Sequence, residues 1–273
     1  MSQYTKQEIR EIFFEALDAF NDCYESDITR ENIVLAFFTP DNGLEVYEQL
    51  CRKYFPRNLS ENYHAEGYFH SFAAQAFVGD AQYGIMVRPD LDYPREEYFQ
   101  ILLHEISHLY CTRNEIEGGR FFDRYCMGSG EEDGMMNAGY AVWRETVADI
   151  MADSILYEYT RWTLNEIKAE VKQLYNEMSP SNPDSKKCMS LIIGYIMDTK
   201  EVGGAESWPD AESQLKKRLG IKDHLFIAVI EMVFENLHRS PFWTITPEFI
   251  MNLGQTYLTM LTLKLFKTDL DRS

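Results

Sequence analysis

The chain has little positive charge for its size. It holds 26 lysine and arginine residues against 44 aspartate and glutamate residues, a formal net charge of -18 over 273 residues. A surface this acidic repels phosphate backbones, and no basic run or basic amphipathic stretch offsets it. We therefore expect no nucleic-acid partner, and ordinary solubility is a sufficient explanation of the acidity.

Paired cysteines and long apolar runs are also missing. The five cysteines are odd in number and form no C-x-x-C pair, which argues against a disulfide framework and a cysteine zinc site. No segment is apolar for long enough to span a bilayer, and the first twenty residues lack the apolar stretch of a signal peptide. We expect a cytoplasmic protein, in a reducing compartment and without membrane contact.

The chain is able to bury a large core, because 45% of its 273 residues are hydrophobic. No internal repeat is visible in it. A strand is predicted at Tyr83–Arg88, paired with part of 67–78 across a Gly79-Asp80 turn. Six glycines indicate a long loop at 112–139. Helical periodicity predicts helices near 5–22, 28–38, 42–55, 94–112, 140–160, 162–177, 186–198, 210–238 and 247–266. The fold class expected is α+β, predominantly helical, with a small antiparallel sheet before the helix at 94–112.

That helix carries an H-E-x-x-H motif in the segment ILLHEISHLY. His104 and His108 lie four residues apart, about 40° round the helix axis, so both imidazoles can reach one ion. Glu105 lies beside them, where it can take a proton from a zinc-bound water. The apolar stripe that begins at Phe99 points almost opposite the histidines, which is not expected of ordinary core histidines.

A catalytic zinc site normally has a third protein ligand. The best source is WRETVADIMAD, where Glu145 and Asp149 share one helix face with small alanines. Carboxylates buried among alanines need a compensating charge, which a dication would supply. An exposed acidic pair on an amphipathic helix is the alternative. Asp123, Glu115 and Glu117 are the competing third ligands.

With these two motifs the sequence resembles the gluzincin metallopeptidases, in which H-E-x-x-H is followed by an E-x-x-x-D helix. The resemblance covers about residues 67–156. It implies that Glu145 is the third zinc ligand and that Asp149 hydrogen-bonds a ligand histidine. It also implies that the strand Tyr83–Arg88 is a sheet edge that pairs with an extended peptide. The domains expected are then a zincin-like catalytic region at 1–160 and a helical lobe at 161–273, with the cleft between them.

The family usually presents a tyrosine or histidine that stabilises the oxyanion. Tyr140 is the first candidate here, and Tyr125, His224 and His238 are others that spacing does not separate. We interpret His64 and His70 as structural, and Cys111 as a buried cysteine rather than a nucleophile. The glycine-rich segment 112–139 is a candidate lid.

The function predicted is zinc-dependent hydrolysis of peptide bonds, with a peptide or protein as substrate. Zn²⁺ would be held by His104, His108 and Glu145, and Glu105 would be the general base. A non-catalytic zincin-like protein that binds a peptide or protein partner is the alternative. A helical interaction protein with an accidental motif is a third possibility. Substrate identity, endo- or exo-cleavage and oligomeric state do not follow from the sequence.

Overall fold

The computed structural model describes residues 4–59, 64–114, 116, 119–156, 164–182, 184–197, 199, 202–238 and 245–270. The chain divides into two compact units, Met1–Asn114 and Glu115–Ser273. These units are defined by packing alone, and the domains expected at 1–160 and 161–273 stay a prediction. None of the helices within the described ranges combines the length and apolar character needed to traverse a bilayer.

The first unit is built on a three-stranded sheet. Its strands are β1 (Ile33–Phe37), β2 (Ala74–Val78) and β3 (Tyr83–Val87), in the order β1-β3-β2. β2 and β3 form the antiparallel pair expected from the turn signal, while β1 runs parallel to β3, so the sheet is mixed. Every residue of the central strand β3 is buried. The prediction of a mostly helical α+β protein with a small sheet is confirmed.

Two details of the sequence reading are wrong in this region. The helix expected at 28–38 is the strand β1, because a short apolar run such as IVLAF fits a buried strand as well as a helix. The strand expected as a sheet edge, β3, lies in the centre, because β1 pairs with its second side. Among the described strands, β1 and β2 are the edges.

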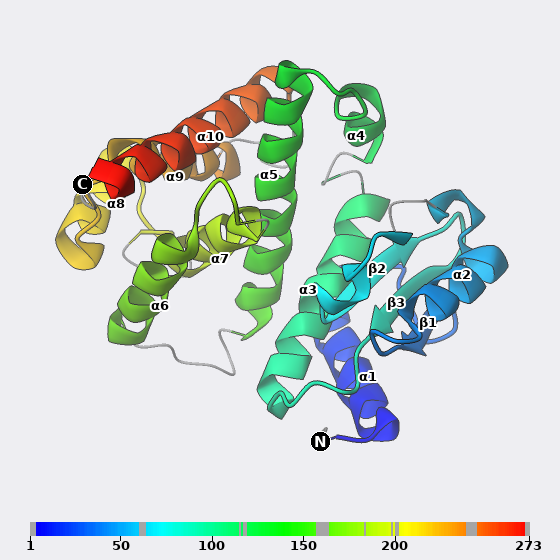
Figure 1. Cartoon of the computed structure of the whole chain (residues 1–273). Helices are drawn as coiled ribbons and strands as arrows, with labels where there is room; N and C mark the ends of the chain where they lie inside the picture. The colour runs from blue at the N-terminus through cyan, green and yellow to red at the C-terminus, as the bar shows by residue number, and fades with distance from the viewer. Residues whose placement is uncertain are drawn as a thin grey trace. The chain divides into compact units, whose positions relative to one another are not determined.

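Helices cover both faces of this sheet (Figure 1), and all three were expected from the sequence. The first face carries α1 (Lys6–Cys23) and α3 (Arg95–Arg113), which contact each other, and α3 also contacts β2. The other face carries α2 (Gly43–Tyr54), which shares a core cluster with Phe77 of β2 and Met86 of β3. Short 3-10 turns lie at Pro56–Asn58 and Tyr68–His70.

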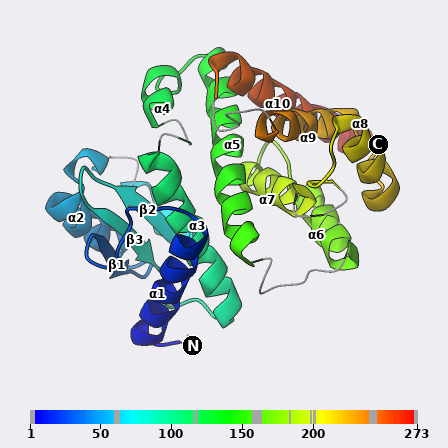
Figure 2. The same ribbon diagram turned by 180° about the vertical axis from the view of Figure 1, so that it is seen from behind.

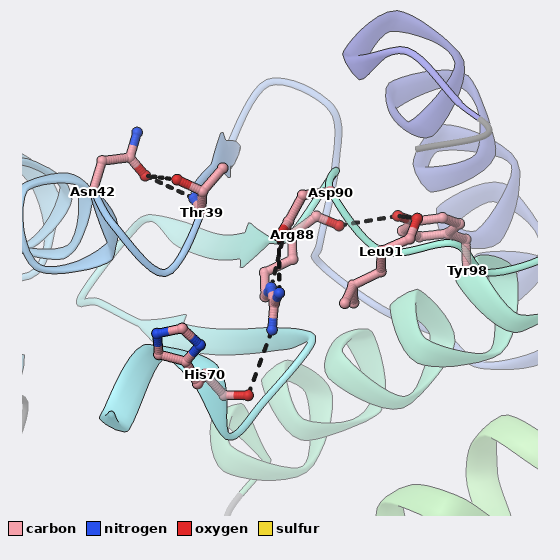
Figure 3. Close-up of polar contacts among 7 residues, drawn as sticks. All are labelled: Thr39, Asn42, His70, Arg88, Asp90, Leu91 and Tyr98. Atoms are coloured by element: carbon pink, nitrogen blue, oxygen red, sulfur yellow. Dashed lines mark hydrogen bonds and ion pairs between the residues drawn. The ribbon is translucent and has the colours of Figure 1, made fainter. Parts of the chain in front are cut away.

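The connection from β3 to α3 is held by polar contacts (Figure 3). The Arg88 guanidinium donates two hydrogen bonds to the Asp90 carboxylate, at 3.1 and 2.8 Å, and a longer one to the His70 carbonyl. These bonds keep the pKa of Asp90 below its usual value. The buried Tyr98 hydroxyl donates to the carbonyls of Arg88 and Leu91, both at 3.1 Å. Hydrogen bonds thus hold the loop between β3 and α3 at both of its ends.

A similar local contact precedes α2. The Asn42 carboxamide oxygen accepts the backbone N–H of Thr39 at 2.7 Å, closing the turn after β1 (Figure 3). Asn42 is the residue before the first helical turn, but its side chain makes no capping hydrogen bond to that turn. Its role is therefore to set the loop rather than to cap the helix.

The elements of the second unit are all helices in its described part (Figures 1 and 2). Its longest helices are α5 (Glu131–Leu156) and α10 (Pro247–Leu270), and α5 contacts both α10 and α7. The others are α4 (Gly119–Tyr125), α6 (Leu164–Glu177), α7 (Ser185–Met197), α8 (Trp208–Gln214), the π-helix η4 (Leu215–Leu219) and α9 (His224–Leu237). α6 contacts α7, and α9 contacts α8 and α10.

Two predicted boundaries fail in this unit. The loop expected at 112–139 contains α4 and the first nine residues of α5, since the turn at Gly128 and Gly130 starts a helix. Asp133 anchors that turn by accepting the backbone N–H of Gly130 at 2.7 Å. The single helix expected at 210–238 is broken at Gly220, whose positive φ of 69° a helix does not accommodate.

Candidate metal centre

The H-E-x-x-H helix α3 is buried on most of its surface. Leu102, Ile106 and Leu109 are inaccessible to solvent, as the apolar stripe predicted, and Leu103 and Ser107 on other sides are inaccessible too. The helix begins at Arg95, after Pro94, and carries Glu96 and Glu97 in its first turn, where acids complement the helix dipole. A helix fixed in this way holds its side chains in one orientation.

The two histidines of the motif lie against each other. Their ring centroids are 4.6 Å apart and the ring planes are nearly perpendicular, at 89°. His108 is 4% exposed and His104 is partly buried. Glu105 is buried as well, which is costly for a carboxylate that has no charge to compensate it. Of the three motif side chains, Glu105 and His108 are therefore shielded from bulk water, and His104 is partly shielded.

The second motif lies on α5. Asp149 is 7% exposed and Glu145, one turn earlier, is partly buried. The α7 residue Gly194 faces Asp149 closely, because a Cβ added to it would lie 3.5 Å from the Asp149 Cβ. The alternative of an exposed acidic pair therefore does not describe Asp149, which belongs to the packed side of the helix.

The sequence did not predict the contact of Glu145 with Arg144. The Arg144 guanidinium approaches the Glu145 carboxylate, with Nε 3.6 Å from Oε1. Both side chains keep contact with solvent, at 42% and 27% exposure, so the pair is a weak one. The sequence W-R-E placed the two residues side by side, but adjacent helix positions usually diverge, and only coordinates show the contact.

The side chains of His104, His108 and Glu145 form a group that can hold a metal ion. One ligand atom from each, two imidazole nitrogens and a carboxylate oxygen, lie within 4.8 Å of one another. The donor chemistry of the group fits a divalent transition metal.

Of the other third-ligand candidates, Asp123 is not part of this group. Asp123 is exposed on α4, and Glu115 and Glu117 lie outside the described residues. Among the other histidines, His64, His70, His224 and His238 are all exposed. Cys111 is buried, as expected for a structural thiol.

Tyr140 lies on α5, five residues before Glu145. Its ring stacks on Phe121 of α4 with the centroids 5.9 Å apart, and it also contacts the ring of Phe122 at 5.5 Å. This packing fixes the ring, which is 7% exposed. Its part in oxyanion stabilisation stays a prediction.

Comparison with known protein families, with curated proteins and with solved structures found no match for this chain.

Proposed function

We propose that this protein is a zinc-dependent peptidase of the gluzincin type. Its metal would be held by His104, His108 and Glu145, with Glu105 as general base. The observation that supports this most directly is the group of two imidazoles and one carboxylate with ligand atoms within 4.8 Å. Two histidines and one glutamate are the protein ligands of a common class of catalytic zinc sites.

The metal, when bound, would polarise the scissile carbonyl and lower the pKa of the attacking water. Glu105 follows His104 directly on α3 and is shielded from solvent. Its carboxylate would accept the proton of the water and return it to the leaving amine. Asp149 would orient a ligand imidazole, a role that its burial one turn after Glu145 supports. Tyr140 is the proposed donor to the oxyanion.

The peptide substrate would pair with β2 rather than β3. β2 is an edge of the described sheet and contacts α3, the helix that carries the motif. An edge strand offers unpaired backbone groups to an extended peptide. We also propose a cytoplasmic location, which the odd number of cysteines and the lack of a C-x-x-C pair support.

One observation favours a second candidate, a protein without catalytic metal. Arg144 already supplies a positive charge 3.6 Å from the Glu145 carboxylate. In that case Arg144, and not a metal ion, would balance the negative charge of Glu145. The protein would then bind a peptide or protein partner without catalysing a reaction.

Metal content and turnover separate these functions. Purified full-length protein is analysed for zinc by mass spectrometry, and a peptide library is digested with zinc and with a chelator. We expect about one zinc per chain and cleavage that the chelator abolishes. Zinc without cleavage would support the non-catalytic zincin-like protein, and absence of zinc would refute the metal site altogether.

Two variants test the roles of individual residues. Glu145→Gln removes a ligand and should weaken zinc binding by more than about 100-fold, exceeding the effect of outer-shell changes. Glu105→Gln should retain zinc and lose roughly 10²–10⁴-fold in turnover, the usual contribution of a general base. Matched controls are Glu132→Gln on α5 and Glu96→Gln on α3, both exposed. Full activity in Glu105→Gln would exclude Glu105 as the base.

A further inference from the structure

A basic pocket opens in the second unit of this acidic protein. Its volume is about 700 Å³, and it lies among α6, η4 and the segment that leads from Gly220 into α9. Five cationic side chains and one carboxylate line it: Lys168, Lys172, Lys217, Arg218, Lys222 and Asp223. Over the whole chain acids outnumber bases 44 to 26, so the pocket reverses the general charge balance.

The one carboxylate of the pocket is engaged by the fold. Oδ1 of Asp223 accepts the backbone N–H groups of Leu225 and Phe226, at 3.0 and 3.2 Å, and so caps α9. Oδ2 accepts the hydroxyl of Tyr175 at 2.8 Å. Both carboxylate oxygens of Asp223 therefore accept hydrogen bonds from within the protein, and the residue has a structural role in the wall of the pocket.

The lysines of the pocket are different. In the described part of the chain, no residue forms an ion pair with Lys168, Lys172, Lys217 or Lys222. Lys216, next to Lys217 on the same π-helix, points elsewhere and pairs with Glu212 at 2.6 Å. The lysine outside the pocket is thus paired with a carboxylate, whereas the four lysines that line the pocket are available to bind an anion.

Their arrangement is unfavourable without a ligand. Lys168 and Lys172 lie four residues apart on α6, where two like charges repel each other across one helix turn. Lys217 and Arg218 occupy the last turn of η4, where the helix dipole stabilises positive charge. The dipole does not account for the lysine pair of α6 or for Lys222. Cations from three separate segments converge on one space, and a bound anion would relieve their repulsion.

The remaining lining limits the kind of anion. Val171 and Phe226, both buried, line the pocket, and Leu219 and Ile221 add apolar surface. The volume falls in the range of small-molecule sites, about 300–1,000 Å³. A nucleic acid would meet strong repulsion from the rest of a chain whose net charge is -18. A compact ligand avoids this repulsion, because only the pocket touches it.

We propose that this pocket binds a compact small-molecule polyanion that carries two or more phosphate or carboxylate groups. The ammonium groups of Lys168, Lys172, Lys217 and Lys222 contact the anionic groups, and the apolar lining residues accept the carbon skeleton. This site is separate from the proposed zinc group and does not depend on it.

Calorimetric titration of the full chain tests the site with two probes, fructose 1,6-bisphosphate for phosphate and propane-1,2,3-tricarboxylate for carboxylate. We expect at least one probe to bind with a dissociation constant below about 100 µM at low salt, and more weakly as salt screens the lysines. The double variant Lys168→Gln/Lys172→Gln should weaken binding at least about tenfold, equivalent to about 1.4 kcal/mol. Lys216→Gln, the matched control, should change it less than about twofold.

The outcomes are distinct. Binding of one probe alone assigns the chemical group that the pocket prefers. If neither probe binds more tightly than about 1 mM, the proposal is overturned. It is also overturned if the double variant binds like the parent, or if Lys216→Gln loses as much affinity, since the attraction would then be general surface charge. Zinc content should be equal in all three proteins.

Discussion

Two glycines of α5 should respond in opposite directions to the same substitution. Gly139 lies against α10, and a Cβ added to it would stand 2.1 Å from the Ile250 carbonyl oxygen and 2.8 Å from the Gly254 nitrogen. Gly134, in the same helix, has nothing within 4 Å of an added Cβ. The substitutions Gly139→Ala and Gly134→Ala therefore differ only in what the new methyl group meets.

The magnitudes follow from these distances. Ordinary carbon contacts lie near 3.5 Å, so in Gly139→Ala the backbone of α10 must move by about 1 Å or more. Overpacking of this kind costs about 1–3 kcal/mol, and more where rigid backbone must shift, while alanine returns about 1 kcal/mol of helix propensity. We expect a net loss of about 2 kcal/mol. Gly134→Ala should instead gain about 0.5–1 kcal/mol, because only the propensity changes.

Tryptophan fluorescence isolates the unit that these changes affect. All four tryptophans, at positions 143, 162, 208 and 243, follow Asn114, so their emission reports unfolding of Glu115–Ser273. At about 2–4 °C per kcal/mol for a unit of this size, Gly139→Ala should lower the melting temperature by about 4–8 °C. Gly134→Ala should raise it by about 1–4 °C. Equal shifts of one sign in both variants would refute the close contact between α5 and α10.

Two further predictions concern the first unit. Thr5→Ala removes the hydroxyl that accepts the Glu8 N–H at 3.3 Å in a capping box, so amide hydrogen exchange in the first turn of α1 should quicken by an amount equivalent to about 1 kcal/mol. In Asp90→Asn the Arg88 pair is lost, and because the pair is partly exposed the cost near neutral pH is about 0.5–1 kcal/mol. Since the folded pKa of Asp90 is lowered from 3.8, this contribution is complete above pH 3.8 and disappears as pH falls through the folded pKa. Denaturant midpoints of parent and variant should thus converge in acid, and a constant difference down to pH 2 would contradict the assignment.

Helices were predictable from the sequence where apolar residues recur at helical spacing over a continuous stretch of chain. The helices expected at 5–22, 94–112 and 162–177 agree with α1, α3 and α6 to within two residues. Periodicity failed at 28–38, where an apolar run became β1, and at 210–238, where Gly220 interrupts the helix. A short apolar run contains no information on the partner that will pair with it.

The sequence by itself determined that His104, Glu105 and His108 share one helix turn, because their spacing matches the helix repeat whatever surrounds it. It also pointed to Glu145, but through composition and family resemblance alone. Only the tertiary structure placed β3 in the centre of its sheet and gathered lysines from three segments into one pocket. The physical reason is that backbone geometry sets the relation of residues a few positions apart, whereas distant residues meet only through the packing of whole elements.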